Sequence, residues 1–193
     1  MKQHISRRKI LTFNNSRDAF GVAQYLLGYD VNSTNPDEWR AAEEKLKEQK
    51  PLIQSYVMDE VFNKMEAGEA AMAPYYAGDY LTMKQENDDL AFVYPKEGTN
   101  KFVDVMCIPS SSENKKAAEL FINYMCEPEV ALHNANYLGY LCPVTAVLSD
   151  DRYEYKDNEV LYPKQEVKTQ FFHNLDQDTL DLLSKLWEDL KLA

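Results

Sequence analysis

A short apolar run, a turn and then a helical pattern follow one another several times along this 193-residue chain. Strands are predicted over residues 9–13, 52–57, 70–75, 91–94 and 102–108. Helices are predicted over residues 17–27, 36–50, 59–66, 78–84, 114–126, 128–137 and 178–190. Residues 149–165 are polar and charged, and we expect them to form a long exposed connection. Strands that alternate with helices predict an α/β architecture with a largely parallel or mixed sheet.

Local signals mark the start of one helix and the end of another. Asn35 can accept hydrogen bonds from the first free N–H groups, and Pro36 suits the first helical position because it has no N–H. Gly28 can take the left-handed conformation that ends the preceding helix. We expect residues 43–48 to form a solvated face, and the helix over 114–126 to turn Leu120 and Phe121 inward.

Charge and hydropathy exclude two classes of partner. Lys plus Arg number 21 against 32 Asp plus Glu, which gives a formal net charge of −11 and repels a phosphate backbone on average. No apolar run reaches the roughly 18–20 residues of a membrane span. The basic start, MKQHISRRKI, lacks the apolar stretch of about 7–15 residues that a secretory signal needs. We therefore expect a protein that is either cytosolic or lacks its natural beginning.

The cysteines indicate no redox or metal motif. Cys107, Cys126 and Cys142 fit no CxxC spacing, and an odd number leaves one thiol unpaired in any disulfide scheme. We expect all three to be buried free thiols.

Motifs of well-known enzyme classes are also missing from the sequence. It contains no GxSxG elbow, no GxxxxGK[ST] phosphate loop and no HExxH pair. His4, His133 and His173 are too far apart in the chain to form a helical metal pair. No metal and no cofactor is therefore predicted. A hydrolase with two carboxylates stays open as an alternative, because acidic residues are plentiful.

Aromatic and acidic residues gather at the ends of the predicted strands, where open α/β sheets bind ligands. The set comprises Asn15, Asp18, Tyr75, Tyr76, Phe102 and Asp104. Carboxylates pair with ammonium groups, and rings cover methylenes and attract positive charge, so the set suits an organic cation. The competing interpretation is that the rings belong to the core and that Asp18 only favours the start of a helix.

Five stretches combine into a specific pattern: FNNSRDAFGVAQYLLGY, NPDEWRAAEEKLKEQKP, YVMDEVFNKMEAGEAAMAPYYAGDY, FVYPKEGTNKFVDVMCIP and KKAAELFINYMCEPEVA. Together they resemble the spermidine/putrescine-binding proteins of bacterial ABC importers, from about Lys9 to the C-terminus. The resemblance implies an α/β fold of the type II periplasmic-binding-protein kind, with two lobes and a ligand cleft. It also implies a binder and not an enzyme, located outside the cytoplasmic membrane, free or anchored, that delivers polyamine to a permease and an ATPase.

The resemblance assigns roles to the six residues. Asp104 matches an acid that pairs with a ligand amine, and Phe102 matches a ring stacked on the ligand. Tyr76 matches a further cleft aromatic, often tryptophan in relatives, and Tyr75 beside it is a weaker match. Asp18 matches an acid at the start of the first helix, and Asn15 stands where some relatives have a second acid.

A polar contact is also expected near His173 and Asn174. Neither Trp39 nor Trp187 lies at a cleft position, so stacking falls to tyrosine and phenylalanine. The lower charge at position 15 fits a shorter diamine, weaker binding or another cation. A receptor for iron, a sugar or another small ligand is the alternative within the same fold.

The resemblance also implies a division of the chain. Residues 9–101 and 149–193 are expected to form the second lobe, residues 102–148 a returning segment of the first lobe, and residues 1–8 a poorly structured start. Most of the first lobe and its signal would then be absent. On this basis we expect weak or no polyamine binding, and self-association through residues 102–148, whose apolar face needs cover.

Overall fold

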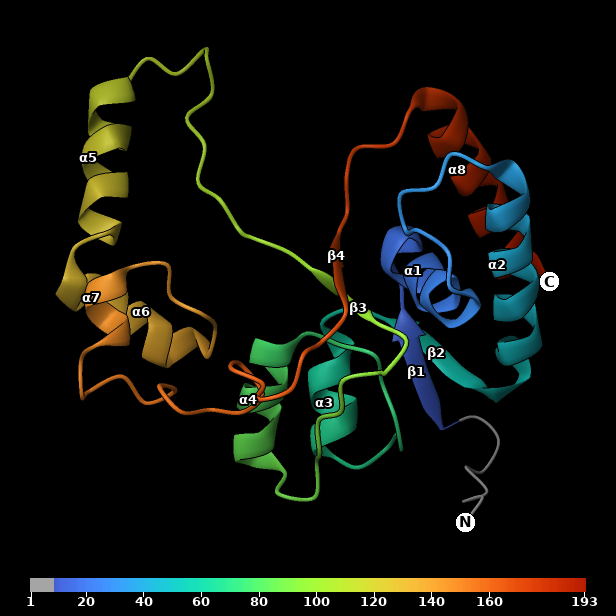
Figure 1. Ribbon diagram of the computed structural model, residues 1–193, viewed down its shortest axis with the longest axis horizontal. Helices are drawn as coiled ribbons and strands as arrows, with labels where there is room; N and C mark the ends of the chain where they lie inside the picture. The colour runs from blue at the N-terminus through green and yellow to red at the C-terminus, as the bar shows by residue number, and fades with distance from the viewer. Residues whose placement is uncertain (1–8) are drawn as a thin grey trace. The chain divides into compact units, whose positions relative to one another are not determined.

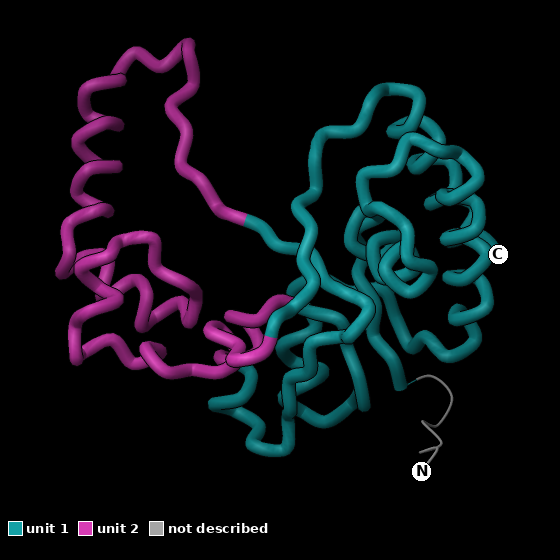
Figure 2. Tube along the Cα trace, in the orientation of Figure 1, with its two compact units in different colours: residues 1–75, 83–102, 166–193 teal, residues 76–82, 103–165 magenta. Residues whose placement is uncertain are grey.

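The computed structural model describes residues 9–193, which form two compact units (Figure 2). Unit 1 contains the described chain up to Tyr75 together with Met83–Phe102 and Glu166–Ala193. Unit 2 contains Tyr76–Thr82 and Val103–Gln165. The chain thus passes between the units four times, once inside a helix. The start predicted for residues 1–8, and His4 with it, lies outside the described residues.

Unit 1 is built on a parallel pair of strands, β1 (Ile10–Phe13) and β2 (Ile53–Val57), in which Phe13 is the partner of Val57 (Figure 1). Its helices are α1 (Ser16–Leu27), α2 (Pro36–Gln49), α3 (Glu60–Glu66) and α8 (Gln177–Leu192), with a 3₁₀ turn η1 (Lys50–Leu52) before β2. Parallel strands need a crossover between them, and α1 and α2 supply it.

The core of unit 1 lies where helices α1, α2 and α8 pack together. Phe20 and Trp39 are almost fully buried, and their ring centroids lie 5.8 Å apart. Leu183, Leu186 and Leu190 recur along one face of α8 and complete this cluster. The predicted apolar face of the C-terminal helix is therefore the face that holds unit 1 together.

Helix ends in unit 1 follow the local signals of the sequence. The Asn35 side chain accepts a hydrogen bond from the Asp37 amide, and Pro36 opens α2. Asn15 caps α1 in the same way, by accepting from the Arg17 amide at 2.9 Å. Gly28 ends α1 with φ of 75°, a conformation that a side chain would strain.

A second, much shorter strand pair also belongs to unit 1. Strand β3 (Thr99–Lys101) runs parallel to β4 (Thr169–Phe171), with Asn100 opposite Gln170. Phe102, the last residue before the chain enters unit 2, follows β3 directly. The chain returns to unit 1 at Glu166, three residues before β4.

Unit 2 contains helices α5 (Lys115–Met125), α6 (Pro128–Leu138) and α7 (Thr145–Leu148), and the first half of α4 (Ala77–Glu86). Its small core comprises Ala131, Leu132, Ala135, Val147 and Tyr153. Arg152 binds Glu129 of α6 with both terminal nitrogens, at 3.0 and 2.7 Å, and also binds Asp150. The hydrogen bonds that Arg152 donates to Asp150 lower the pKa of the Asp150 carboxyl to about 2.

Three of the predicted strands do not form. Residues 70–75 make only an isolated bridge between Met72 and Ile10, and Pro74 follows, which cannot donate to a ladder. Residues 91–94 and 102–108 belong to no strand in the described chain. Their residues favour strands by type, but propensity alone does not make a sheet.

Several expected exposures also differ from the structure. The 149–165 connection buries Tyr153 and Leu161, because its turns fold back on α6 and α7. Glu43, expected on a solvated face, is buried with its carboxylate 2.9 Å from the Lys47 ammonium.

The predictions for the thiols and for the 114–126 helix were wrong about burial. All three cysteines are free, as expected, but Cys107 and Cys126 are exposed and Cys142 is half-buried. Helix α5 has no buried residue, so its apolar side chains, Phe121 among them, have no core to enter within unit 2. Among the described residues, no helix has both the length and the apolar character to cross a membrane.

Candidate functional site

A hydrogen-bonded acid–phenol pair stands at the start of α4 in unit 2. Tyr140 is the second residue after α6, and its hydroxyl donates to Asp79 Oδ1 at 2.8 Å. Burial of the phenol raises the pKa of Tyr140, and the hydrogen bond and charge of Asp79 raise it further. The charge of Asp104 acts in the same direction, although more weakly than that of Asp79. Tyr140 is therefore a neutral donor at every physiological pH, in an environment that favours a cation.

Two glycines allow this pair to form. A Cβ on Gly78 would lie 2.2 Å from a carbon of the Tyr140 ring, so only glycine lets the ring lie against α4. Gly139 ends α6 with φ of 69°. A Cβ on Gly139 would lie 3.5 Å from the Gly78 carbonyl oxygen. The backbones of α4 and the end of α6 therefore approach closely, and this sets the position of Tyr140.

Two of the six predicted residues belong to unit 2. Asp104 is exposed on the extended segment that enters the unit. Tyr76 is half-buried just before α4, where its carbonyl accepts from the Tyr80 amide at 3.1 Å. The Asp104 carboxylate is exposed, and its charge acts on the Tyr140 phenol of the same unit.

The other four residues belong to unit 1, and two of them are at the start of α1. Asn15 uses its side-chain oxygen to cap the helix, which gives this residue a structural role. Asp18 is 8% exposed, and its Oδ1 accepts a hydrogen bond of 3.4 Å from the Asn100 amide of β3. Asp18 also interacts electrostatically with the neighbouring Arg17 guanidinium.

Tyr75 and Phe102 differ in how they are packed. The Tyr75 ring stacks on Phe13 at 5.8 Å and meets Phe62 edge-on at 6.1 Å, as a core aromatic does. Phe102 is 43% exposed and follows β3, so it has ring surface available to a ligand. Asn32 Oδ1 accepts from the His173 amide at 2.7 Å, which fixes the backbone where a further polar contact was expected.

Sequence reasoning did not single out Tyr140 and Asp79 of unit 2, or Asn100 of unit 1, as candidate residues. A tyrosine directly after a helix-ending glycine was the only local signal for Tyr140, and such pairs are common. Asp79 and Asn100 gain their partners through contacts 61 and 82 residues away in the chain. In the part of the chain that the structure describes, no group of three or more His, Cys, Asp or Glu could hold a metal ion.

Comparison with known proteins decides the family. The model of the family described as bacterial extracellular solute-binding protein matches residues 3–161. The chain belongs to this family. It is 31% identical over 157 residues to the spermidine/putrescine-binding periplasmic proteins of Salmonella typhimurium and Escherichia coli, which covers 81% of the chain and 45% of each relative. The chain thus spans about half the length of these curated relatives.

Solved structures agree with the sequence relatives. The spermidine/putrescine ABC transporter substrate-binding protein PotD from Streptococcus pneumoniae matches with a TM-score of 0.81 and 29% identity, over 96% of this chain and 58% of that one. The Tp0655 lipoprotein of Treponema pallidum has a TM-score of 0.80 at 18% identity, which supports the fold alone. The chain therefore has part of the α/β fold of the type II periplasmic binding proteins, as the resemblance predicted.

Proposed function

We propose that this chain is part of the substrate-binding component of a polyamine importer and holds its ligand as a cation. The observation that carries the proposal is the likeness, along 81% of the chain, to proteins named for spermidine and putrescine binding. The chemistry of both units supports it. Asp104, Asp79 and Tyr140 in unit 2, and Asp18 and Phe102 in unit 1, combine negative charge with aromatic surface.

The proposed roles follow from what each side chain offers. In unit 2, Asp104 pairs with a ligand ammonium. In unit 1, the exposed Phe102 ring offers a surface for ligand methylenes. A ring contact of this kind contributes about 0.5–2 kcal/mol, depending on how far the cation is desolvated. Asp18 supplies charge from a buried position, and Tyr76 supplies further aromatic surface. Tyr75 and Asn15 contribute least, since one packs against Phe13 and the other caps a helix.

The proposal extends to the partners and the location. The protein would deliver polyamine to a permease and an ATPase, outside the cytoplasmic membrane, and would carry out no catalytic step. Residues 9–101 and 149–193 would correspond to the second lobe of the relatives, and residues 102–148 to a segment of their first lobe.

Titration calorimetry with spermidine and putrescine tests the proposal. We expect weak binding, with a dissociation constant above about 1 μM, which corresponds to less than about 8 kcal/mol. Asp104→Asn should abolish the heat, because it removes the proposed partner of the ammonium group with little change in shape. Work at about 0.15 M salt suppresses attraction to the net charge alone.

Asp151→Asn is the matched control, because Asp151 is a fully exposed acid of the same unit. Equal losses in the two variants would show that polyamine responds only to net charge and would contradict a site at Asp104. Heat with a neutral sugar that matched the heat with spermidine would favour the other receptor interpretation.

We also propose that a second copy of this chain covers the exposed apolar face of α5. Phe121 and Tyr124, one turn apart, are 57% and 58% exposed, and Val103–Met106 before them is an exposed extended stretch without a strand partner. Exchange of residues 102–148 between two copies would cover the α5 face and the extended stretch. Light scattering should show a dimer at micromolar concentration and a monomer for Phe121→Asp, whereas a monomeric parent protein would contradict the proposal.

A further inference from the structure

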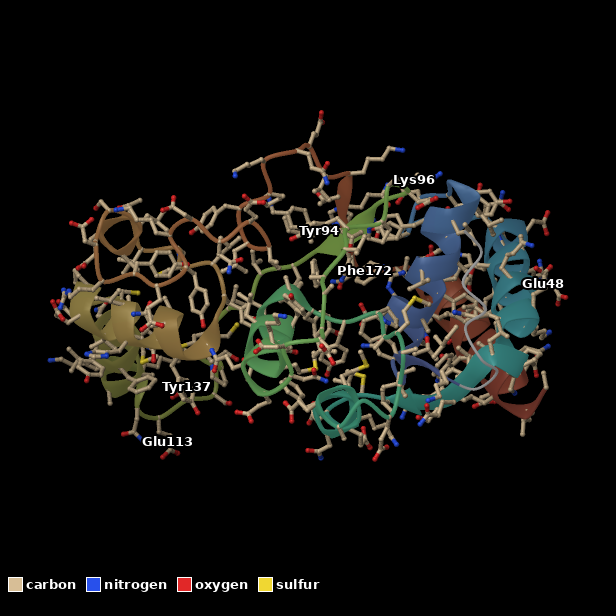
Figure 3. The ribbon with its side chains drawn as sticks, turned by 90° about the horizontal axis from the view of Figure 1, so that it is seen from below. Glu48, Tyr94, Lys96, Glu113, Tyr137 and Phe172 are labelled. Carbon is tan, nitrogen blue, oxygen red and sulfur yellow. The ribbon has the colours of Figure 1, made fainter. Side chains whose placement is uncertain are left out.

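Arg17 stands out in unit 1 because its guanidinium is held from several sides. It lies over the Phe172 ring at 4.6 Å and over the Trp39 ring at 5.7 Å (Figure 3 labels Phe172). It donates to the Val31 carbonyl and to Asn32 Oδ1, each at 3.0 Å, and to the His173 carbonyl at 3.4 Å. Burial lowers the pKa of Arg17, although arginine stays charged.

The Asn32 side chain connects Arg17 to the chain around strand β4. Its Oδ1 accepts from the His173 amide at 2.7 Å, and its Nδ2 donates to the Phe171 carbonyl at 2.8 Å. One residue earlier, the Val31 amide donates to the Gln170 side chain at 3.2 Å. The loop after α1 is therefore linked to the chain around β4 by three hydrogen bonds that involve the side chains of Asn32 and Gln170. Arg17 in turn fixes the position of Asn32.

Strand β4 in turn pairs with the strand that contacts Asp18 and precedes Phe102, two of the candidate ligand residues. Its partner β3 contains Asn100, which donates to Asp18, and leads directly into Phe102. The pair has only three residues in each strand, which is too short to be stable by itself. Contacts from outside the pair must hold it in place, and the Arg17–Asn32 contacts are suited to do so.

We propose that Arg17 is a positioning residue of the ligand site, acting through Asn32 and β4 on β3, Asn100 and Phe102. This inference rests on the proposed function for its consequence for binding, but not for the structural coupling itself. A planar guanidinium can donate to three acceptors while its faces lie on two rings. Lysine has the charge but not this shape, so Arg17→Lys should not restore the arrangement.

Amide hydrogen exchange of the full chain tests the coupling without any ligand. In Arg17→Gln, and in Asn32→Ala, exchange at Thr99–Lys101 and Thr169–Phe171 should become at least about tenfold faster, the factor expected from losing one hydrogen bond to a charged group. Exchange in α2 and α8 should change far less in Asn32→Ala, whose side chain is outside the core cluster. Arg17→Lys should resemble Arg17→Gln.

Arg40→Gln is the matched control, because it removes a guanidinium that makes only an exposed ion pair with Asp37. Unchanged exchange at β3 and β4 in Asn32→Ala would overturn the proposal, and so would a uniform rise across all of unit 1, which marks a general loss of stability. In the same variants the dissociation constant for spermidine should rise at least about threefold, since affinity falls with the fraction of molecules in which the site is formed.

The two proposals fail in different ways. If the parent chain shows no response to spermidine, the proposed function fails while the exchange data still decide the coupling. If spermidine binds and the variants retain full affinity despite faster exchange, the coupling is real but Arg17 does not position the ligand site.

Discussion

Replacement of Trp39 by alanine is expected to lower the free energy of unfolding of unit 1 by about 3–5 kcal/mol. Trp39 is 1% exposed at the centre of the α1–α2–α8 cluster, and its indole N–H donates to the Ser33 carbonyl at 2.7 Å. The substitution removes the largest fully buried side chain and leaves a cavity beside Phe20. It also leaves the Ser33 carbonyl without this partner.

Urea unfolding followed by the fluorescence of the remaining tryptophan measures this loss. Trp187 lies on α8, edge-on to Tyr56 at 5.6 Å, so it reports on unit 1. Trp187→Ala is the control, with Trp39 as the reporter, and should cost clearly less because Trp187 is only partly buried. Equal losses in the two variants would mean that the cluster around Trp39 is not the main source of stability in unit 1.

Elements governed by local chemistry could be predicted from the sequence. Asn35 and Pro36 start α2, and Gly28 ends α1, because a cap depends on a few neighbouring residues. The long helices were found for a similar reason, since a face of apolar residues is repeated over several turns. The α/β class follows from the same pattern, and the parallel pair β1–β2 confirms it.

Strands could not be predicted equally well, because a strand depends on partners that are distant in the chain. Residues 91–94 and 102–108 are rich in β-forming residues but have no partner strand among the described residues. Strands β3 and β4, in contrast, have the sequences TNK and TQF, which no pattern separates from a loop. Asn32 and Gln170 link the loop after α1 to β4 through contacts about 140 residues apart in the chain, which no local pattern shows.

The candidate site shows the same limit. Residue types and the resemblance pointed to Asp104 and Phe102, which the structure leaves exposed, and to Asp18, which it buries beside Asn100. They also pointed to Tyr75, which the structure packs against Phe13. Tyr140 was missed because its role depends on a close approach between α4 and the end of α6, and only the three-dimensional structure shows that approach.

Gly78→Ala is expected to separate Tyr140 from Asp79 and so to disrupt the acidic site of unit 2. The added Cβ would lie 2.2–2.5 Å from three atoms of the Tyr140 ring, far inside contact distance. Alanine in a helix gains up to about 1 kcal/mol over glycine, whereas overpacking costs about 1–3 kcal/mol. Because the contact is far inside van der Waals distance, we expect a cost near the upper end of that range and a net loss of up to about 2 kcal/mol in the stability of unit 2.

Gly21→Ala in α1 is the matched control, because its Cβ would meet the Phe172 ring only at 3.2 Å, and the helix-propensity gain of up to about 1 kcal/mol offsets this milder contact, so we expect no comparable loss of stability. Tyr140→Ala combined with Gly78→Ala should lower the free energy of unfolding by less than the sum of the two single changes, since without the ring there is no clash.

Tyr140→Phe removes only the hydrogen bond from Tyr140 to Asp79, so the carboxylate frequency of Asp79 in an infrared difference spectrum should shift. Additive losses in the double variant, or an unshifted Asp79 band in Gly78→Ala, would show that the ring accommodates the methyl group and that Gly78 does not control the position of Tyr140.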